Sequence, residues 1–292
     1  MALSGDELQQ WVRIALSEDV GSGDVTTIAL VPPQATTTAV MVAREALTVA
    51  GLELAELAFH ECARSVQVAR HSTDGESVEK GRVLLKITGS AAAILTAERV
   101  ALNFVQRLSG VATLTARYVA AVQGTSAQIL DTRKTTPGLR RLEKYAVACG
   151  GGKNHRMGLH DQILIKDNHV ATLASESTTP ITLAVHRAHE RFPHMKIEVE
   201  ADTLSQAEEA VAAGAHIVLL DNMSLQDMAT AVKRIAGRAK TEASGGVNLD
   251  TVRAIAETGV DYISVGALTH SARSVDIALD FLETPQMHNT DV

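Results

Sequence analysis

One segment of this chain concentrates side chains that could bind an anionic ligand. Residues 133–166 contain eight Lys and Arg residues against two acidic ones, a charge of +6 in a chain whose net charge is −7. Arginine makes planar two-point contacts with a carboxylate or phosphate, and lysine adds a compact point charge. Glycines within the segment let a backbone approach a ligand closely. A solvated basic face is the usual meaning of such a run, but this combination predicts a pocket for a small ligand with several negative charges.

The candidate residues of this segment stand at or between the ends of two predicted strands, 127–131 and 162–166. Polar groups at the carboxyl ends of parallel strands meet on one face, which is where barrel enzymes build their sites. The candidates are Thr132, Arg133, Lys134, His155, Arg156 and Lys166.

Two acidic residues end later apolar strands and are predicted to face the same site. Glu200 and Asp221 each stand at the end of a predicted apolar strand. Beside a cationic pocket they could bind a Mg²⁺-polyphosphate, hold sugar hydroxyls or stabilise a developing positive charge. An ordinary ion-paired acid at a strand end is the alternative.

Two short glycine loops, Ser244-Gly245-Gly246 and Val265-Gly266-Ala267, follow the last two predicted strands. In barrels, loops at these positions often bind phosphate through backbone N–H groups, and glycine permits the close approach. The alternative is that they only form the turn into a helix, and both roles can coexist.

The first part of the chain predicts a small α+β unit. A helix is expected at 6–19, and short β-branched segments at 36–45, 65–72 and 81–89 predict a mixed or antiparallel sheet. A long apolar-periodic stretch follows at 91–122. We expect two helices there, interrupted at Ser109-Gly110, that lead into a second domain.

From residue 127 the pattern becomes strand, loop and helix in repetition, which predicts a parallel sheet covered by helices. The expected strands are 127–131, 162–166, 196–200, 216–220, 240–244 and 261–265, with helices capped by Ser224 and Asn248. Their polar ends recur about every 22 residues, which favours a barrel. Six strands instead of eight make the barrel irregular, unless the glycine-rich region 137–160 replaces or hides a strand.

Composition excludes several classes of protein. A net charge of −7 and only eight aromatic residues argue against nucleic-acid binding. No run approaches the ~18 apolar residues of a membrane span, so no membrane association is expected. Two cysteines, Cys62 and Cys149, cannot form a disulfide scaffold, and a cytoplasmic location is expected.

The chain closely resembles quinolinate phosphoribosyltransferase, over nearly its whole length and in the same order. The resemblance rests on EDVGSGDVTT, AERVALNFVQRLSGVAT, TRKTTPGLRRLEKYAVACGGGKNHRMGLHDQILIKDNH, IEVEAD, IVLLDNM, EASGGV and DYISVGALTHS. It implies an α/β protein with an N-terminal α+β open-faced sandwich domain, placed at 1–110, followed by an irregular, incomplete α/β barrel, placed at 111–292. The implied enzyme of NAD biosynthesis joins quinolinate to phosphoribosyl pyrophosphate (PRPP), giving nicotinate mononucleotide, pyrophosphate and CO₂. It implies Mg²⁺ with PRPP, no organic cofactor, and a homodimer.

The resemblance also implies roles for individual residues. Quinolinate would be bound by Thr132, Arg133, Lys134, His155, Arg156 and Lys166, joined by Arg99 of the other subunit. Lys134 and Lys166 would lie between the two substrates. Glu200 and Asp221 would face the ribose and its metal. Ser244, Gly245, Gly246, Val265, Gly266, Ala267 and His270 would hold the phosphate of PRPP.

Two other functions stay open at this point. One is a related phosphoribosyltransferase that acts on another small acid, such as a monocarboxylate. The other is a binding or regulatory protein that keeps the pocket without the chemistry. The presence of Lys134, Lys166, Glu200 and Asp221 argues against the second.

Overall fold

The structure is a computed structural model that describes residues 3–282, which divide into two compact units. The sandwich unit contains residues 3–114, 141–151 and 272–282, and the parallel-sheet unit contains residues 115–140 and 152–271. The domains expected from the sequence, 1–110 and 111–292, stay a prediction. Residues 283–292 of the second lie outside the described residues.

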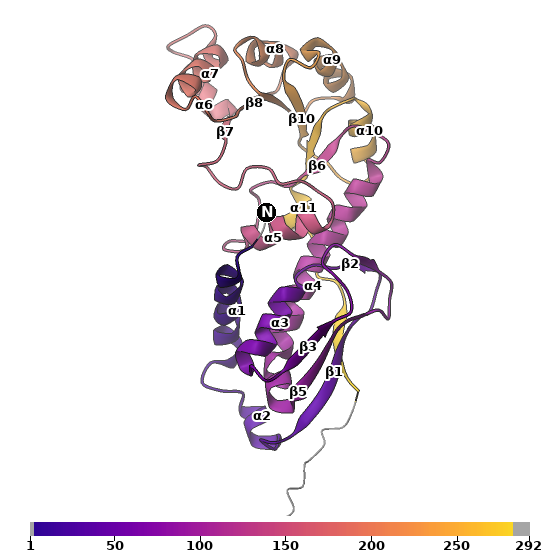
Figure 1. The fold of residues 1–292 in the computed structure, drawn as a ribbon. Helices are drawn as coiled ribbons and strands as arrows, with labels where there is room; N and C mark the ends of the chain where they lie inside the picture. Colours follow the sequence, from indigo (N-terminus) through magenta and orange to yellow (C-terminus); the bar gives the residue numbers. More distant parts are fainter. Residues whose placement is uncertain (1–2, 283–292) are drawn as a thin grey trace, which may run out of the picture. The chain divides into compact units, whose positions relative to one another are not determined.

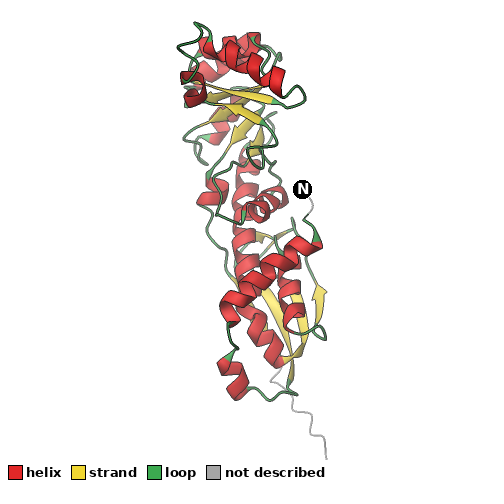
Figure 2. Cartoon of the chain, turned by 90° about the vertical axis from the view of Figure 1, so that its left-hand side faces the viewer, coloured by secondary structure: helices red, strands yellow, loops and turns green. Residues whose placement is uncertain are grey.

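The sandwich unit is built on a four-stranded antiparallel sheet with one open face. Its strands, in the order β12-β1-β5-β3, are β1 (Thr36–Ala43), β3 (Gln67–Arg70), β5 (Val83–Ser90) and β12 (Ile277–Phe281). Along β5, Leu85 and Ile87 are buried while Lys86 and Thr88 are exposed, the alternation of a sheet covered on one side. Figure 2 shows the helices of this unit gathered on one side of its strands. The predicted N-terminal sheet domain is confirmed.

Helices and a small ribbon complete this part of the chain. They are α1 (Gly5–Val20), α2 (Val25–Leu30), α3 (Leu52–Cys62), α4 (Ala91–Ala121), α5 (Arg140–Cys149) and the ribbon of β2 (Leu47–Thr48) with β4 (Ser77–Val78). Helix α1 begins with a capping box, in which the Ser4 hydroxyl accepts from the Glu7 N–H and the Glu7 carboxylate accepts from the Ser4 N–H. Its buried residues Leu8 and Val12 lie one turn apart and hold it to the core.

The expected interruption at Ser109-Gly110 is wrong, because α4 runs through it as one helix of 31 residues. Both small residues serve close packing. The Ser109 hydroxyl pairs with the backbone of Ala50, and a Cβ on Gly110 would lie 2.0 Å from the Arg273 carbonyl oxygen. No helix among the described residues is long and apolar enough to cross a membrane.

The parallel-sheet unit contains six parallel strands, as predicted. They are β6 (Gln128–Leu130), β7 (Ile163–Ile165), β8 (Ile197–Ala201), β9 (Ile217–Asp221), β10 (Lys240–Ser244) and β11 (Tyr262–Ser264), in the order β6-β11-β10-β9-β8-β7. Among the described residues no ladder joins β6 to β7, so the barrel is incomplete. Neighbouring strands are in register at their ends, where Asp221 pairs with Ser244.

Helices follow the strands in alternation, and Figure 1 shows α7, α8 and α9 along the outer side of the sheet. They are α6 (Asp167–Ala171), α7 (Pro180–Arg191), α8 (Leu204–Ala212), α9 (Leu225–Ile235), α10 (Val252–Glu257) and α11 (Ala267–His270). Ser224 caps α9 as predicted. The predicted cap at Asn248 is wrong, because α10 begins after Thr251 and the Asn248 carboxamide instead accepts N–H bonds in the preceding turn.

The glycine-rich region 137–160 contains no full strand in the structure. It contains α5, and Lys153 forms one isolated parallel bridge with Leu130 of β6. Of the two alternatives left open by the sequence, the structure therefore favours the irregular barrel over a strand hidden in this region.

Candidate active site

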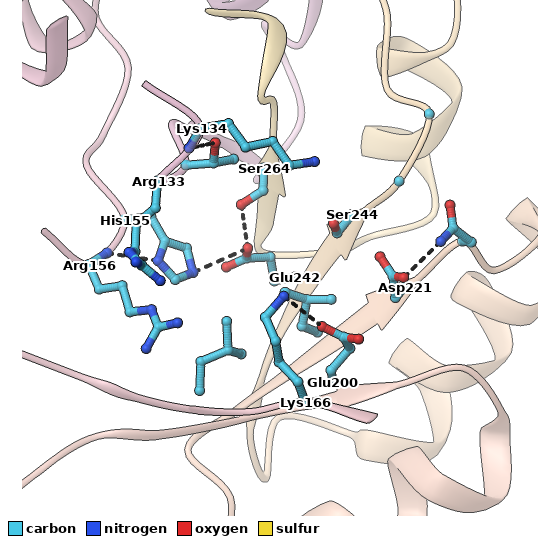
Figure 3. A pocket seen from close by; sticks show the side chains of 16 residues that line it. Arg133, Lys134, His155, Arg156, Lys166, Glu200, Asp221, Glu242, Ser244 and Ser264 are labelled. Atoms are coloured by element: carbon cyan, nitrogen blue, oxygen red, sulfur yellow. Dashed lines mark hydrogen bonds and ion pairs between the residues drawn. The ribbon is translucent and has the colours of Figure 1, made fainter. Parts of the chain in front are cut away.

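The carboxyl ends of the six parallel strands surround a cavity of about 630 Å³. Most of the predicted site residues line it, and Figure 3 shows their side chains around the opening. They are Thr132, Arg133, Lys134, His155, Arg156, Lys166, Glu200, Asp221, Ser244, Gly245 and Gly246. Residues that are more than 110 positions apart in the chain therefore meet in one pocket.

The second glycine loop lies at the edge of this group. A Cβ on Gly266 would lie 3.1 Å from His270 Nε2 and 3.2 Å from Lys134 Cδ, so both side chains are next to this glycine. Val265 is buried, and its N–H donates to the carbonyl of Leu130 in β6. Ala267 is the first residue of α11. These residues lie beside Lys134 but do not line the cavity.

Arg99 belongs to a different unit of the chain from the other predicted residues, which all lie in the parallel-sheet unit. It is exposed on α4, within the sandwich unit. Its expected role across a subunit interface stays a prediction.

Two guanidinium groups form the cationic side of the pocket. Arg156 is buried, with 9% of its surface exposed, and donates from Nη1 to the Gln162 carbonyl at 3.2 Å. Burial lowers the pKa of Arg156, and the charge of Arg133 lowers it further. The Nε of Arg133 is buried and has no hydrogen-bond partner among the described residues. Two neighbouring positive groups, one of which has a buried Nε without an acceptor, favour an anion with more than one carboxylate.

A third arginine, which sequence reasoning missed, positions the loops that carry these groups. Arg140 donates from Nε to Thr135 Oγ1 at 3.0 Å and from Nη1 to the Met157 carbonyl at 3.1 Å. Its Nη2 reaches the Arg133 carbonyl at 3.4 Å. The five donors of one guanidinium thus tie together the segments before and after α5, and nothing in the sequence distinguished it from its neighbour Arg141.

Carboxylates occupy the opposite side of the pocket. Lys166 Nζ lies 3.6 Å from Glu200 Oε2. Burial raises the pKa of Glu200, against the attraction of Lys166. Glu200, Asp202 and Asp221 offer oxygens within 4.8 Å of one another. Carboxylate oxygens are the ligands that Mg²⁺ prefers, so this set suits that ion. Asp202 was not predicted, although its place two residues after Glu200 could have indicated it.

The loop after β10 needs its first glycine for two reasons. Gly245 has φ +96°, and a Cβ there would lie 2.1 Å from Asn222 Oδ1. Asn222 in turn donates from its backbone N–H to the Ser244 carbonyl at 3.0 Å and from Nδ2 to Asp221 Oδ2 at 2.7 Å. The glycine loop and the Asp221 carboxylate are therefore packed as one unit.

His155 lines the pocket, but both of its ring nitrogens face protein groups. Nδ1 accepts from the Arg156 N–H at 2.7 Å, and Nε2 lies 3.0 Å from Glu198 Oε2 and 3.5 Å from Glu242 Oε1. The His155 backbone N–H donates to Asp131 Oδ1 at 2.8 Å. Since Nδ1 is an acceptor here, the proton of a neutral ring is on Nε2 and points at the two carboxyl groups.

Sequence reasoning missed these two buried acids, Glu198 of β8 and Glu242 of β10. Both are fully buried, and Glu242 lines the pocket. Each stands two residues before a predicted site residue, Glu200 or Ser244. Because strand side chains alternate, that spacing places each acid on the same face as the predicted residue and could have revealed it.

Comparison with known families matches both parts of the chain. The family model described as "Quinolinate phosphoribosyl transferase, C-terminal domain" matches residues 111–280, and the corresponding N-terminal domain matches residues 24–109. Curated relatives give the same result. A probable nicotinate-nucleotide pyrophosphorylase [carboxylating] of Bacillus subtilis is 44% identical over 94% of this chain and 93% of its own length. The corresponding protein of Mycobacterium leprae is 44% identical over 94% of this chain and 97% of its own.

Solved structures agree with these matches over nearly the whole chain. The nicotinate-nucleotide pyrophosphorylase from Francisella tularensis is 38% identical with a TM-score of 0.90, and the match covers 96% of this chain and 98% of that one. NadC from Streptococcus pyogenes is 40% identical with a TM-score of 0.91, and the match covers 97% of this chain and 100% of that one.

Proposed function

The chain belongs to the quinolinate phosphoribosyltransferase family, and on that premise we propose how its pocket performs the reaction. The activity is that of a nicotinate-nucleotide pyrophosphorylase (carboxylating) in NAD biosynthesis, so the substrates are quinolinate and PRPP. One observation carries the assignment of the site. A single cavity combines a pair of guanidinium groups with a set of carboxylates on its opposite side.

Quinolinate occupies the cationic side in this proposal. Arg133 and Arg156 each bind one of its two carboxylates, and Thr132 and His155 line the same part of the pocket. The unpartnered Nε of Arg133 supports a ligand there, because a buried donor without an acceptor costs free energy. Lys134 lies between this subsite and the phosphate loops.

PRPP occupies the side formed by the later strands. The loops 244–246 and 265–267, with His270, would hold its 5-phosphate through backbone N–H groups, as glycine-rich loops after barrel strands do. Glu200 and Asp221 would hold Mg²⁺ together with the substrate, and the spacing of their oxygens supports this. When bound, that ion neutralises charge on the leaving pyrophosphate. Lys166 would add a positive charge between the substrates.

The residues act by placing charge and aligning the reactants. As pyrophosphate leaves, positive charge builds on the ribose, and the carboxylates of Glu200 and Asp221 stabilise it. Because the protein holds quinolinate by its two carboxylates, the pyridine nitrogen attacks the sugar from a fixed distance. Once bonded to ribose the ring is cationic, so it accepts the electron pair left when the adjacent carboxylate departs as CO₂.

We also propose a homodimer in which Arg99 reaches the partner's pocket, and its exposed position on α4 supports this. A cytoplasmic location is supported by the two free cysteines, Cys62 and Cys149.

Competition between two pyridine acids tests the proposed quinolinate subsite. Nicotinate lacks one of the two carboxylates, so one buried guanidinium would lose its partner, at a cost of about 2 kcal/mol or more. Calorimetric titration should show quinolinate binding at least about 30-fold more tightly than nicotinate. Equal affinities would contradict the two-carboxylate pocket and favour a transferase for a monocarboxylate.

A further inference from the structure

Glu242 separates two cavities of the parallel-sheet unit. It lines the substrate cavity at the carboxyl ends of the strands. It also lines a second cavity of about 200 Å³, whose other walls include Gln128, Lys196, Ile217 and Tyr262 at the amino ends of the strands. Its side chain is fully buried between the two. A group in this place can exchange a proton with either cavity.

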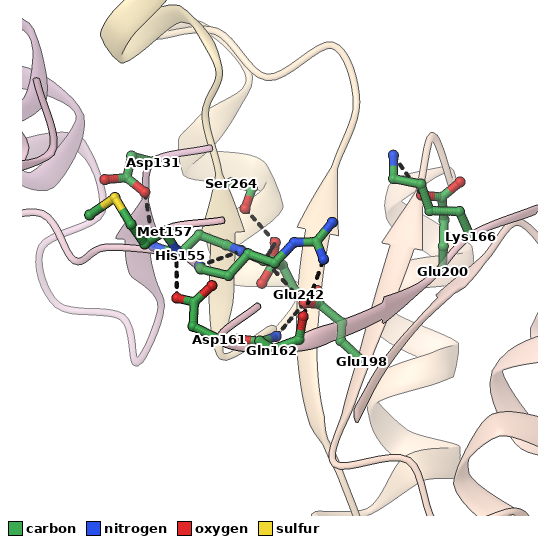
Figure 4. Close-up of polar contacts among 11 residues, drawn as sticks. Asp131, His155, Met157, Asp161, Gln162, Lys166, Glu198, Glu200, Glu242 and Ser264 are labelled. Atoms are coloured by element: carbon green, nitrogen blue, oxygen red, sulfur yellow. Dashed lines mark hydrogen bonds and ion pairs between the residues drawn. The ribbon is translucent and has the colours of Figure 1, made fainter. Parts of the chain in front are cut away.

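The hydrogen bonds around Glu242 leave one oxygen of its carboxyl group without a partner. Oε1 accepts from the Ser264 hydroxyl and lies 3.5 Å from His155 Nε2. Oε2 is buried with no partner among the described residues, and the same is true of Oε1 of the neighbouring Glu198. The other oxygen of Glu198 accepts from Gln162 Nε2 at 2.7 Å and faces His155 Nε2 at 3.0 Å. Figure 4 shows this cluster.

Two adjacent buried carboxyl groups, each with an orphan oxygen, are satisfied together by one proton. Burial raises the pKa of Glu242 to about 8, and the charge of Glu198 contributes in the same direction, while His155 and the Ser264 hydrogen bond oppose it. Glu242 therefore carries a proton at neutral pH. Its proton is available beside the pocket where quinolinate is proposed to bind.

The reaction needs such a proton. Quinolinate carries a carboxylate on C2, and the nicotinate nucleotide carries hydrogen there. When the bond from C2 to that carboxylate breaks, CO₂ leaves and the electron pair stays on C2, next to the cationic ring nitrogen. We propose that Glu242 donates the proton that C2 then takes up, an inference that rests on the proposed function of this pocket. The O–H bond of Glu242 breaks and its electrons remain on the carboxylate.

The second cavity restores the acid. After donation, the Glu242 carboxylate lies beside the Glu198 carboxylate, and like charges held together in a buried site favour taking a proton back. Water in the second cavity is the source of that proton, and it reaches Glu242 without crossing the substrate. Glu198 acts on substrate only through Glu242 and is a positioning residue.

Glu242→Gln tests the proposal, because it removes the acidic proton and keeps the size and shape of the side chain. The glutamine amide can accept from Ser264 and donate to Glu198 as a protonated glutamate does, but it has no proton to give. In single turnovers with quinolinate, PRPP and Mg²⁺, this variant should still release pyrophosphate. Formation of nicotinate mononucleotide should slow by about 100-fold, the usual contribution of a general acid. Because a C2 carbanion that receives no proton recombines with the CO₂ beside it, the nucleotide that retains both carboxylates should accumulate. Glu208→Gln, an exposed change on α8, should behave as the wild type.

The pH profile gives a second readout that a structural role would not move. In the wild type the rate of nucleotide formation should fall as the pH rises through about 8, and in Glu242→Gln this limb should disappear. Ser264→Ala removes a hydrogen bond that favours the Glu242 carboxylate, so the fall in rate should move to higher pH. This variant also tests the proposal if Glu242→Gln fails to fold.

Three results would overturn the proposal. The first is nucleotide formation by Glu242→Gln at the wild-type rate with the wild-type pH profile, which would make water the acid. The second is an unmoved limb in Ser264→Ala. The third is a wild-type chain that releases no pyrophosphate with quinolinate, which would overturn the proposed function and this inference with it.

Discussion

Substitution of Gly245 by alanine probes how the phosphate loop and Asp221 are packed. Gly245 has φ +96°, and an added Cβ would lie 2.1 Å from Asn222 Oδ1 and 3.1 Å from Asn222 N. The side-chain oxygen could rotate away, but the backbone nitrogen cannot, because its N–H donates to the Ser244 carbonyl. Asn222 must therefore move, and its 2.7 Å bond to Asp221 Oδ2 is strained or lost.

The neighbouring glycine supplies the matched control. Gly246 also has a positive φ, +62°, but a Cβ there would meet nothing within 4 Å. Gly246→Ala should therefore cost only the backbone strain, about 1 kcal/mol. Gly245→Ala should cost that strain and in addition the displacement of Asn222, about 2–4 kcal/mol in total.

Thermal unfolding followed by circular dichroism measures the difference. One kcal/mol lowers the melting temperature of a unit of this size by about 2–4 °C, so Gly245→Ala should melt at least about 2 °C below Gly246→Ala. Because Asp221 loses the hydrogen bond that orients its carboxylate, Gly245→Ala should also raise the KM for PRPP by about tenfold or more. Equal melting temperatures for the two variants would refute the packing argument.

Three further outcomes follow from the site. Arg133→Ala should lower kcat/KM for quinolinate by about 30-fold or more while the circular dichroism spectrum is kept, since one carboxylate loses its buried partner; unchanged turnover would contradict the assignment. Burial raises the pKa of Glu242 from its ordinary 4.5 to about 8, so between these pH values the folded protein holds a proton that the unfolded chain has released. The free energy of unfolding of the wild type should therefore fall as the pH rises through that window, by at most about 1.4 kcal/mol per pH unit relative to Glu242→Gln. Urea unfolding of both proteins at pH 5, 6.5 and 8 checks this, and the same pH dependence in both would count against it. Inactive Arg99→Ala and Lys166→Ala chains, mixed under subunit exchange, should regain about a quarter of wild-type activity through hybrid dimers with one intact site; no recovery would place Arg99 outside the partner's pocket.

The parallel sheet and most of its site could be predicted because both are encoded locally. Each βα unit has its own apolar strand followed by a polar residue, so Glu200, Asp221 and Ser244 were identified from the sequence, and the register of the strands then brings them together. The helix cap at Ser224 was predictable for the same reason, since a cap is a contact between near neighbours in the chain.

Features that depend on distant contacts could not be predicted. The strand β12 pairs with β1 across more than 230 residues, and its short sequence does not identify that partner. Ser109 and Gly110 were mistaken for a break, because only the packing of α4 against backbone shows why they are small. The spacing of Glu242 from Ser244 places it on the face of the site, but its burial could not be predicted, because a charged residue in a strand is usually exposed and this burial depends on a partner from β8.

A direct assay tests the central claim, that this pocket joins quinolinate to PRPP and removes one carboxylate. The chain is incubated with PRPP, Mg²⁺ and either quinolinate or nicotinate, and nicotinate mononucleotide, pyrophosphate and CO₂ are followed. We expect nucleotide and an equal amount of CO₂ from quinolinate, and no product from nicotinate. Product from nicotinate alone would keep the transfer chemistry but contradict the two-carboxylate pocket, and saturable PRPP binding without product from either acid would contradict the account as a whole.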